Sequence, residues 1–317
     1  MLHVRVVSPP AVTGRLVDHL AADAGVLNLV VMRGVAVPAG DAVQFDMQVG
    51  SANAVLAELQ RKGLQRDGSI SIATVDAAIV DAAKRPGWRR TYHGERAPVW
   101  DVVEARIADE ASYAPSFFAL LVFAGLIGAC GILTNSQILI VGAMVVGPEY
   151  SAIIAVALGI ERQNWQPVRR GLLALLTGFL LAIAVTLLFA LCIRGLGKAP
   201  FLYLHGVRPV SDLINSPNLY SVVVAVVAGI VGVVSLTLAR AGALIGVFIS
   251  ITTIPAAADI AVSVAFGSWK EARGSTGQLL LNVGLLIVVG ALALRGQRLI
   301  WRRWARLRGG LPSHPSG

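Results

Sequence analysis

The chain has 317 residues, of which 56% are hydrophobic and only 14% are charged; soluble domains carry roughly 25% charged residues, so a chain that is soluble throughout is excluded. Residues 1–110 hold 12 Lys and Arg against 13 Asp and Glu, a net charge of −1, and residues 111–317 hold 15 against 5, a net charge of +10. Because the basic residues lie in short stretches between apolar segments and the N-terminal part is slightly acidic, the charge pattern indicates membrane topology and excludes a nucleic-acid partner.

Residues 1–80 are predicted to form a soluble α/β domain. Alternating and helical spacings of apolar residues predict strands at 2–7, 26–37, 42–49 and 69–75, and helices at 13–24 and 51–62. The resulting order, βαββαβ, predicts a ferredoxin-like fold. That fold serves many functions, so two roles stay open: binding of a small-molecule regulator, or folding and assembly into a homo-oligomer.

Residues 81–115 are predicted to connect this domain to the membrane. A basic, turn-rich linker occupies residues 81–98. From there, Trp100, Val103 and Ile107 fall near one face of a helix while acidic residues occupy the rest. We expect an amphipathic juxtamembrane helix that lies along the membrane surface or between subunits.

The transmembrane domain is predicted at residues 116–300, in segments of the roughly 20 apolar residues that a membrane span needs. Six such segments cover 116–134, 136–159, 170–194, 218–239, 242–267 and 277–296. The sequence shows no signal peptide, so we expect the N-terminal domain in the cytoplasm and, after six spans, the basic tail at 301–317 on the same side. The third and sixth spans contain few polar residues and are expected to face lipid.

The second span is predicted to be broken. Pro148 removes a backbone donor and clashes one turn back along a helix, and Gly142 and Gly147 ease a break beside it. Glu149 follows directly. A carboxylate near the bilayer centre costs at least about 2.5 kcal/mol, so Glu149 is expected to face a cavity or a partner.

The fifth span repeats this design. Pro255 again interrupts an apolar segment, and Asp259 follows one turn later. Ser250, Thr252 and Thr253 lie just before the proline, where their hydroxyls can bond freed carbonyls or offer oxygens to an ion.

Two interrupted helices, one in each three-span half, indicate a transporter's central site and suggest an inverted repeat. The predicted solute- or ion-binding residues are Glu149, Asp259, Ser250, Thr252 and Thr253, and the predicted helix breaks are Gly142, Gly147, Pro148 and Pro255. Arg240, between the fourth and fifth spans, has two interpretations: a cytoplasmic anchor, or a charge partner of Glu149 or Asp259.

The strings ILIVGAMVVGPEY (138–150) and GALIGVFISITTIPAAADIA (242–261), with the opening LHVRVVSPP, resemble the DUF389 family of bacterial membrane proteins of unknown function. Gly142, Ala143, Met144 and Pro148 match one family motif; Ile249, Ser250, Thr252 and Pro255 match a second. The resemblance implies a ferredoxin-like N-terminal domain, a membrane domain and a place in the bacterial inner membrane. It supplies no activity.

Two functions therefore compete. The first is a transporter or channel that passes a small polar or ionic solute between the broken helices, with carboxylates that bind a cation or couple to protons. The second is a sensor or scaffold in which the N-terminal domain binds a metabolite and nothing is moved. We expect no enzyme activity, cofactor or metal site, because the sequence shows neither a nucleophile with its base nor metal-ligand spacing.

Overall fold

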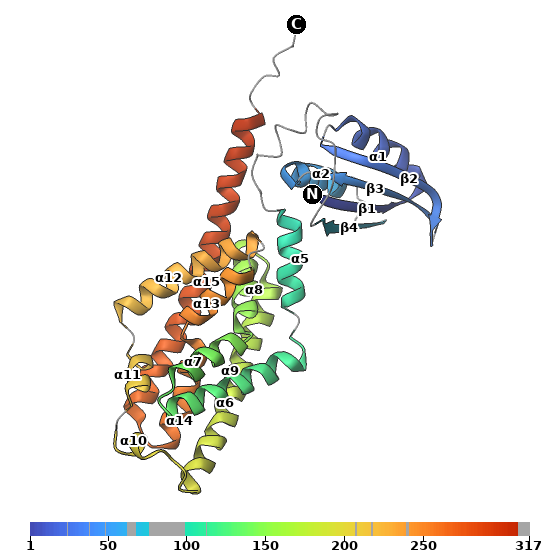
Figure 1. Cartoon of the computed structure of the whole chain (residues 1–317). Coiled ribbons are helices and arrows are strands. Elements are labelled where there is room, and N and C mark those ends of the chain that lie inside the picture. Colours follow the sequence, from blue (N-terminus) through green and yellow to red (C-terminus); the bar gives the residue numbers. More distant parts are fainter. Residues whose placement is uncertain are drawn as a thin grey trace. The chain divides into compact units, whose positions relative to one another are not determined.

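The computed structural model in Figure 1 is mostly helical and has two compact units, Met1–Glu104 and Ala105–Gly317. It describes residues 1–23, 25–37, 39–47, 49–61, 68–75, 99–111, 113–206, 208–216, 218–238 and 241–309. The predicted linker (81–98), the end of the tail (310–317) and Arg240 lie outside these residues. Each unit is described by itself.

The N-terminal unit is a small antiparallel sheet with helices. Its elements are β1 (Leu2–Ser8), α1 (Pro10–Ala22), β2 (Val26–Ala36), β3 (Gly40–Met47), α2 (Val49–Arg61) and β4 (Ser69–Thr74). The strands lie in the order β2-β3-β1-β4, and every neighbouring pair is antiparallel. The predicted helix at 13–24 begins earlier, at Pro10, because a first-turn proline lacks only an N–H that would have no helical partner.

The core of this unit follows the alternation of its strands. Val4, Val6 and Phe45 are fully buried on the strands, and Leu16 and Leu59 are fully buried on the helices. These side chains belong to one apolar cluster between sheet and helices. After the unit's last strand, α5 (Trp100–Glu110) forms where the amphipathic helix is predicted, with Val103 and Ile107 buried.

The second unit is entirely helical in the part that is described. Its elements are α6 (Pro115–Leu133), α7 (Gln137–Val146), α8 (Glu149–Glu161), α9 (Trp165–Gly195), α10 (Phe201–Leu204), α11 (Pro209–Ile214), α12 (Leu219–Thr237), α13 (Ala241–Ser250), α14 (Thr253–Ala265) and α15 (Trp269–Gly309).

Five of the helical segments described are long and apolar enough to cross a membrane. They are Pro115–Leu133, Trp165–Gly195, Leu219–Thr237, Gly242–Ala265 and Trp269–Trp301. The pair α7 and α8 passes the same test together but is bent by 50°, so it adds a sixth span if the pair is counted as one. By the length and composition of these helices, the chain is a multi-pass membrane protein.

The first helix break falls where the sequence predicts it. α7 ends at Val146 and α8 begins at Glu149, which leaves Gly147 and Pro148 between them. Pro148 has no N–H to donate one turn back, so the hydrogen-bond ladder is interrupted there. Gly142 was expected to take part in the break; it lies inside α7 instead, and a Cβ at this position would meet nothing within 4 Å.

The second break lies earlier than predicted. α13 ends at Ser250 and α14 begins at Thr253, so the interruption falls at Ile251 and Thr252 rather than at Pro255. Pro255 occupies the first turn of α14, where a helix tolerates proline. Its missing N–H leaves the carbonyl of Ile251 without its helical donor, and that explains an interruption one turn before the proline.

The helix packing repeats between the two halves of this unit. In the first half, α6 packs against α7 and α9, and α8 packs against α9. In the second half, α12 packs against α13 and α15, and α14 packs against α15. The halves also interlock, because α14 contacts α6 and α9, and α15 contacts α8. Both halves thus consist of a span, two half-helices and a span.

Candidate functional site

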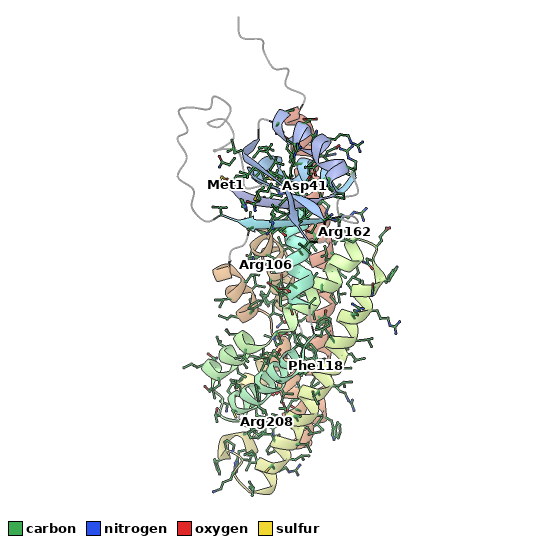
Figure 2. All side chains as sticks on the ribbon, turned by 90° about the vertical axis from the view of Figure 1, so that its right-hand side faces the viewer. Met1, Asp41, Arg106, Phe118, Arg162 and Arg208 are labelled. Carbon is green, nitrogen blue, oxygen red and sulfur yellow. The ribbon has the colours of Figure 1, made fainter. Side chains whose placement is uncertain are left out.

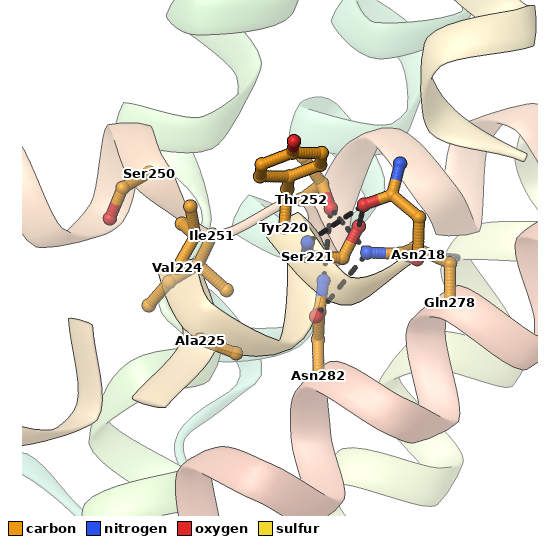
Figure 3. Close-up of a pocket in the computed structure, with 10 residues that line it drawn as sticks. All are labelled: Asn218, Tyr220, Ser221, Val224, Ala225, Ser250, Ile251, Thr252, Gln278 and Asn282. Atoms are coloured by element: carbon orange, nitrogen blue, oxygen red, sulfur yellow. Dashed lines mark hydrogen bonds between the residues drawn. The ribbon is translucent and has the colours of Figure 1, made fainter. Parts of the chain in front are cut away.

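A cavity of about 250 Å³ opens at the break between α13 and α14 (Figure 3). Three elements form it: the first turns of α12, the break itself and the middle of α15. The residues that line it are Asn218, Tyr220, Ser221, Val224, Ala225, Ser250, Ile251, Thr252, Gln278 and Asn282. Two of the predicted binding residues, Ser250 and Thr252, are therefore at the cavity.

One wall of the cavity is polar and hydrogen-bonded. Thr252 Oγ1 accepts hydrogen bonds from Asn282 Nδ2 at 2.9 Å and from Gln278 Nε2 at 3.3 Å. Gln278 and Asn282 lie one turn apart on α15, and each is only 3% exposed. Gln278 Oε1 is buried and has no hydrogen-bond partner among the described residues.

The rest of the lining adds the start of α12 and an apolar face. Asn218 caps α12, since its Oδ1 accepts from the backbone N–H of Ser221 at 3.0 Å. Figure 3 shows the hydrogen-bonded side chains gathered on one side of the cavity and Val224, Ala225 and Ile251 on the other. In the part of the chain that the structure describes, no charged side chain lines this cavity.

Glu149 lies at the first break and contacts the second. The side chain is 7% exposed, and its Oε1 accepts a hydrogen bond of 2.6 Å from Thr253 Oγ1, 104 residues away in the sequence. Its Oε2 is buried without a partner. Gly147 makes room for this carboxylate, because a Cβ there would collide with Glu149 Oε2 and with Ile254. The two broken helices therefore meet at the Glu149–Thr253 hydrogen bond.

Asp259 lies in a separate cluster. It is fully buried, and its two carboxylate oxygens accept hydrogen bonds from Ser211 at 2.6 Å and Ser275 at 2.5 Å. The hydroxyls come from α11 and α15. The sequence groups Asp259 and Glu149 as candidate binding residues; the structure gives them different hydrogen-bond partners, and neither is among the described residues that line the cavity.

Arg208, labelled in Figure 2, lies in the segment between α9 and α12 and holds this segment in place near the hydrogen bonds of Asp259. Arg208 Nη1 donates to Glu271 at 2.7 Å and to Ser268 at 2.5 Å, and its guanidinium carbon lies 4.3 Å from the centre of the Tyr203 ring. Tyr203 is fully buried, and burial raises the pKa of its phenol, which therefore stays protonated. These contacts hold α10 and α11 against the loop between α14 and α15.

Gln278 and Asn282 were missed because the sixth span was expected to face lipid. That expectation is wrong for this stretch, where both amides are buried. A signal was present: two amide side chains four residues apart lie on one face of a helix, and polar side chains in a spanning helix normally face the protein interior.

Residues 144–288 match the family model described as Domain of unknown function (DUF389). This part of the chain is similar to the DUF389 family. The DUF389 match runs from within α7 to within α15, so it contains both helix breaks, the cavity and both buried carboxylates. No curated protein and no solved structure matches the chain.

Proposed function

We propose that this protein is a transporter or channel for a small polar or ionic solute, with its site at the meeting of the two broken helices. One observation carries the proposal: two adjacent residues connect a carboxylate to a polar cavity. Thr252 forms part of the cavity wall, and Thr253 holds the buried Glu149 of the other broken helix. A solute in the cavity and a charge change at Glu149 would therefore act on the same turn.

The unused polar groups support a binding role. A buried acceptor without a hydrogen bond costs about 1–3 kcal/mol. Gln278 Oε1 and Glu149 Oε2 are both buried acceptor atoms without a hydrogen bond. An anchor or scaffold gains nothing from that penalty, whereas in a binding protein a solute or a proton removes it.

Glu149 is proposed as the coupling group. A buried carboxylate with one unpartnered oxygen is strongly disfavoured in its charged form, because no solvent or counter-charge compensates it. Thr253 supplies one hydrogen bond to the other oxygen. Binding of a proton or a cation at Glu149 removes the energetic cost of the buried charge, and release of that proton or cation restores the cost. Uptake and release at Glu149 can therefore alternate with movement of the two half-helices.

Blocking the cavity should stop solute entry. Val224 lines the cavity and is 43% exposed, so Val224→Trp is expected to fill the cavity without displacing the core. Proteoliposomes would be shrunk by glycerol, urea, guanidinium chloride or potassium nitrate, and their re-swelling followed by light scattering. We expect at least one solute to enter faster than into protein-free vesicles, and Val224→Trp to return its rate to that background.

The matched control is Val223→Trp, one residue away, 51% exposed and not in the lining. It adds the same bulk to the same helix and should leave entry unchanged. Equal loss in both variants would place the effect outside the cavity. Absence of entry for all four solutes would reject the transporter or channel and favour the sensor or scaffold.

The N-terminal unit is proposed to be a ferredoxin-like regulatory or assembly domain on the cytoplasmic side, with the C-terminus on that side and with several copies in one assembly. Its element order and its strand order β2-β3-β1-β4 support this fold. Because Met1–Glu104 is a compact unit of its own, we expect deletion of residues 1–98 to leave solute entry in place. Loss of entry from a monodisperse truncated protein would contradict a merely regulatory role.

A further inference from the structure

We propose that the cavity at the α13–α14 break selects a small neutral solute with hydrogen-bond donors, of the urea or amide class, and rejects ions. This inference rests on the proposed function and deepens it by naming the chemical class of the solute. It also separates two roles that the sequence places together: the solute lies in the cavity, and the titrating carboxylate lies outside it.

The first argument is charge. Among the described residues of the lining, Asn, Gln, Ser, Thr and Tyr supply the polar side chains, and none carries a formal charge. Of the carboxylates beside the helix breaks, Glu149 is held by Thr253, and Asp259 by Ser211 and Ser275; neither is among the residues that line the cavity. An ion taken from water into a cavity without a counter-charge loses hydration that nothing replaces. A neutral solute needs only hydrogen bonds.

The second argument is the unused acceptor. The Gln278 side chain is buried, with only 3% of the residue exposed. Its Nε2 donates hydrogen bonds to Thr252 Oγ1 at 3.3 Å and to Asn282 Oδ1 at 3.4 Å. Its Oε1 has no partner, and Gln278 lines the cavity. This oxygen requires an N–H or O–H donor, and a solute of the amide class brings one.

The third argument is that helix ends of both signs meet at the cavity. The first turn of α12 contributes Asn218 and Ser221, and the end of α13 contributes Ser250. A helix N-terminus carries partial positive charge and a helix C-terminus partial negative charge. Pro255 adds to the negative side, because it leaves the carbonyl of Ile251 without a donor. The N-terminus of α14, whose N-cap residue is Thr252, adds a second positive end. Because ends of both signs meet here, the cavity favours a molecule with its own dipole over an ion of either sign.

The fourth argument is size. The cavity measures about 250 Å³, below the roughly 300–1,000 Å³ of pockets that hold drug-sized ligands. Its apolar wall, with Val224, Ala225 and Ile251, leaves the polar contacts to the opposite side. A molecule of a few heavy atoms fits this arrangement, and a large or multiply charged metabolite does not.

Three probes of nearly the same size and planar shape test the charge selection: urea is neutral, guanidinium is a cation and nitrate is an anion. Proteoliposomes with the full-length protein would receive each at a non-denaturing concentration, with potassium and valinomycin present so that charge balance does not limit entry. We expect urea to enter, and both ions to stay at the rate of protein-free vesicles.

Gln278→Leu tests the acceptor. Loss of one hydrogen bond to the solute, worth about 1.4 kcal/mol, predicts roughly tenfold slower urea entry. Thr276→Val is the control, because Thr276 lies on the same helix, bonds only the carbonyl of Ala272 and does not line the cavity. It should leave the urea rate unchanged. An unchanged rate in Gln278→Leu would overturn the assignment of this residue and of the cavity.

The outcomes separate the inference from the function on which it rests. Entry of guanidinium or nitrate at a rate equal to that of urea would overturn the neutral selectivity and leave a transporter or channel in place. Absence of entry for all three probes would end the inference together with the proposed function. The wild-type series decides the charge question without any variant, so a variant that fails to fold does not obscure it.

Discussion

Glu149→Gln is expected to abolish the proton movement that accompanies solute entry. The substitution keeps the size of the side chain and leaves an oxygen for the 2.6 Å hydrogen bond from Thr253, but it removes the group that can take up and release a proton. Proteoliposomes loaded with a pH-sensitive dye would report proton movement while light scattering reports entry of a probe solute. We expect the dye signal to fall to that of protein-free vesicles.

The control for this experiment is Asp212→Asn, which neutralises an exposed carboxylate on α11. It should leave both signals unchanged. Undiminished proton movement in Glu149→Gln would reject Glu149 as the coupling group. Solute entry that persists without proton movement would instead show that entry and coupling are separable, as their different locations at Thr252 and Thr253 suggest.

Arg298→Met is expected to destabilise the membrane unit by about 3 kcal/mol, the lower end for a broken buried ion pair, because it removes the nearer charge partner of Glu161 and leaves Arg162 at 3.9 Å. Arg298 Nε lies 3.4 Å from Glu161 Oε1, and the two side chains are only 7% and 9% exposed. The pair joins the end of α8 to α15, so its loss weakens the contact between the two halves. Thermal unfolding of the purified protein in detergent measures the effect.

A double variant tests the cause. Glu161→Gln in the Arg298→Met background removes the carboxylate that has lost its nearer partner, and it should recover most of the lost stability. Arg303→Met, at an exposed position of the same helix, serves as the control and should change stability little. An unfolding temperature for Arg298→Met equal to that of the wild type would contradict the importance of this pair.

Much of the architecture was accessible from local patterns. Alternating apolar residues place the strands of the N-terminal unit, since alternation is a property of each strand alone. The breaks were also accessible, because proline removes its own N–H wherever it stands. The same rule explains the error at the second break: a proline is tolerated in the first turn of a helix, so the interruption lies at Ile251 and Thr252, before Pro255.

The partners of the polar groups were not accessible in this way. Thr253 and Glu149 are 104 residues apart, and Asp259 takes one hydroxyl from Ser211 and another from Ser275. Which of these side chains form hydrogen bonds with each other depends on how the two halves of the membrane unit pack. A local sequence pattern does not predict that packing. Gln278 and Asn282 show the same limit, because a polar pair in an apolar helix indicates an inward face without indicating what the pair will bond.

The membrane spans, the broken helices and the two acidic residues beside them followed from composition, spacing and the chemistry of proline. Which of those residues line the cavity, and which hold a carboxylate elsewhere, followed only from the packing of the helices. A single predicted site became a neutral cavity at Thr252, a carboxylate held at Thr253 and a second carboxylate held by two serines. The physical reason is that burial and hydrogen bonding set the chemistry of a polar side chain, and both are properties of the assembled helices.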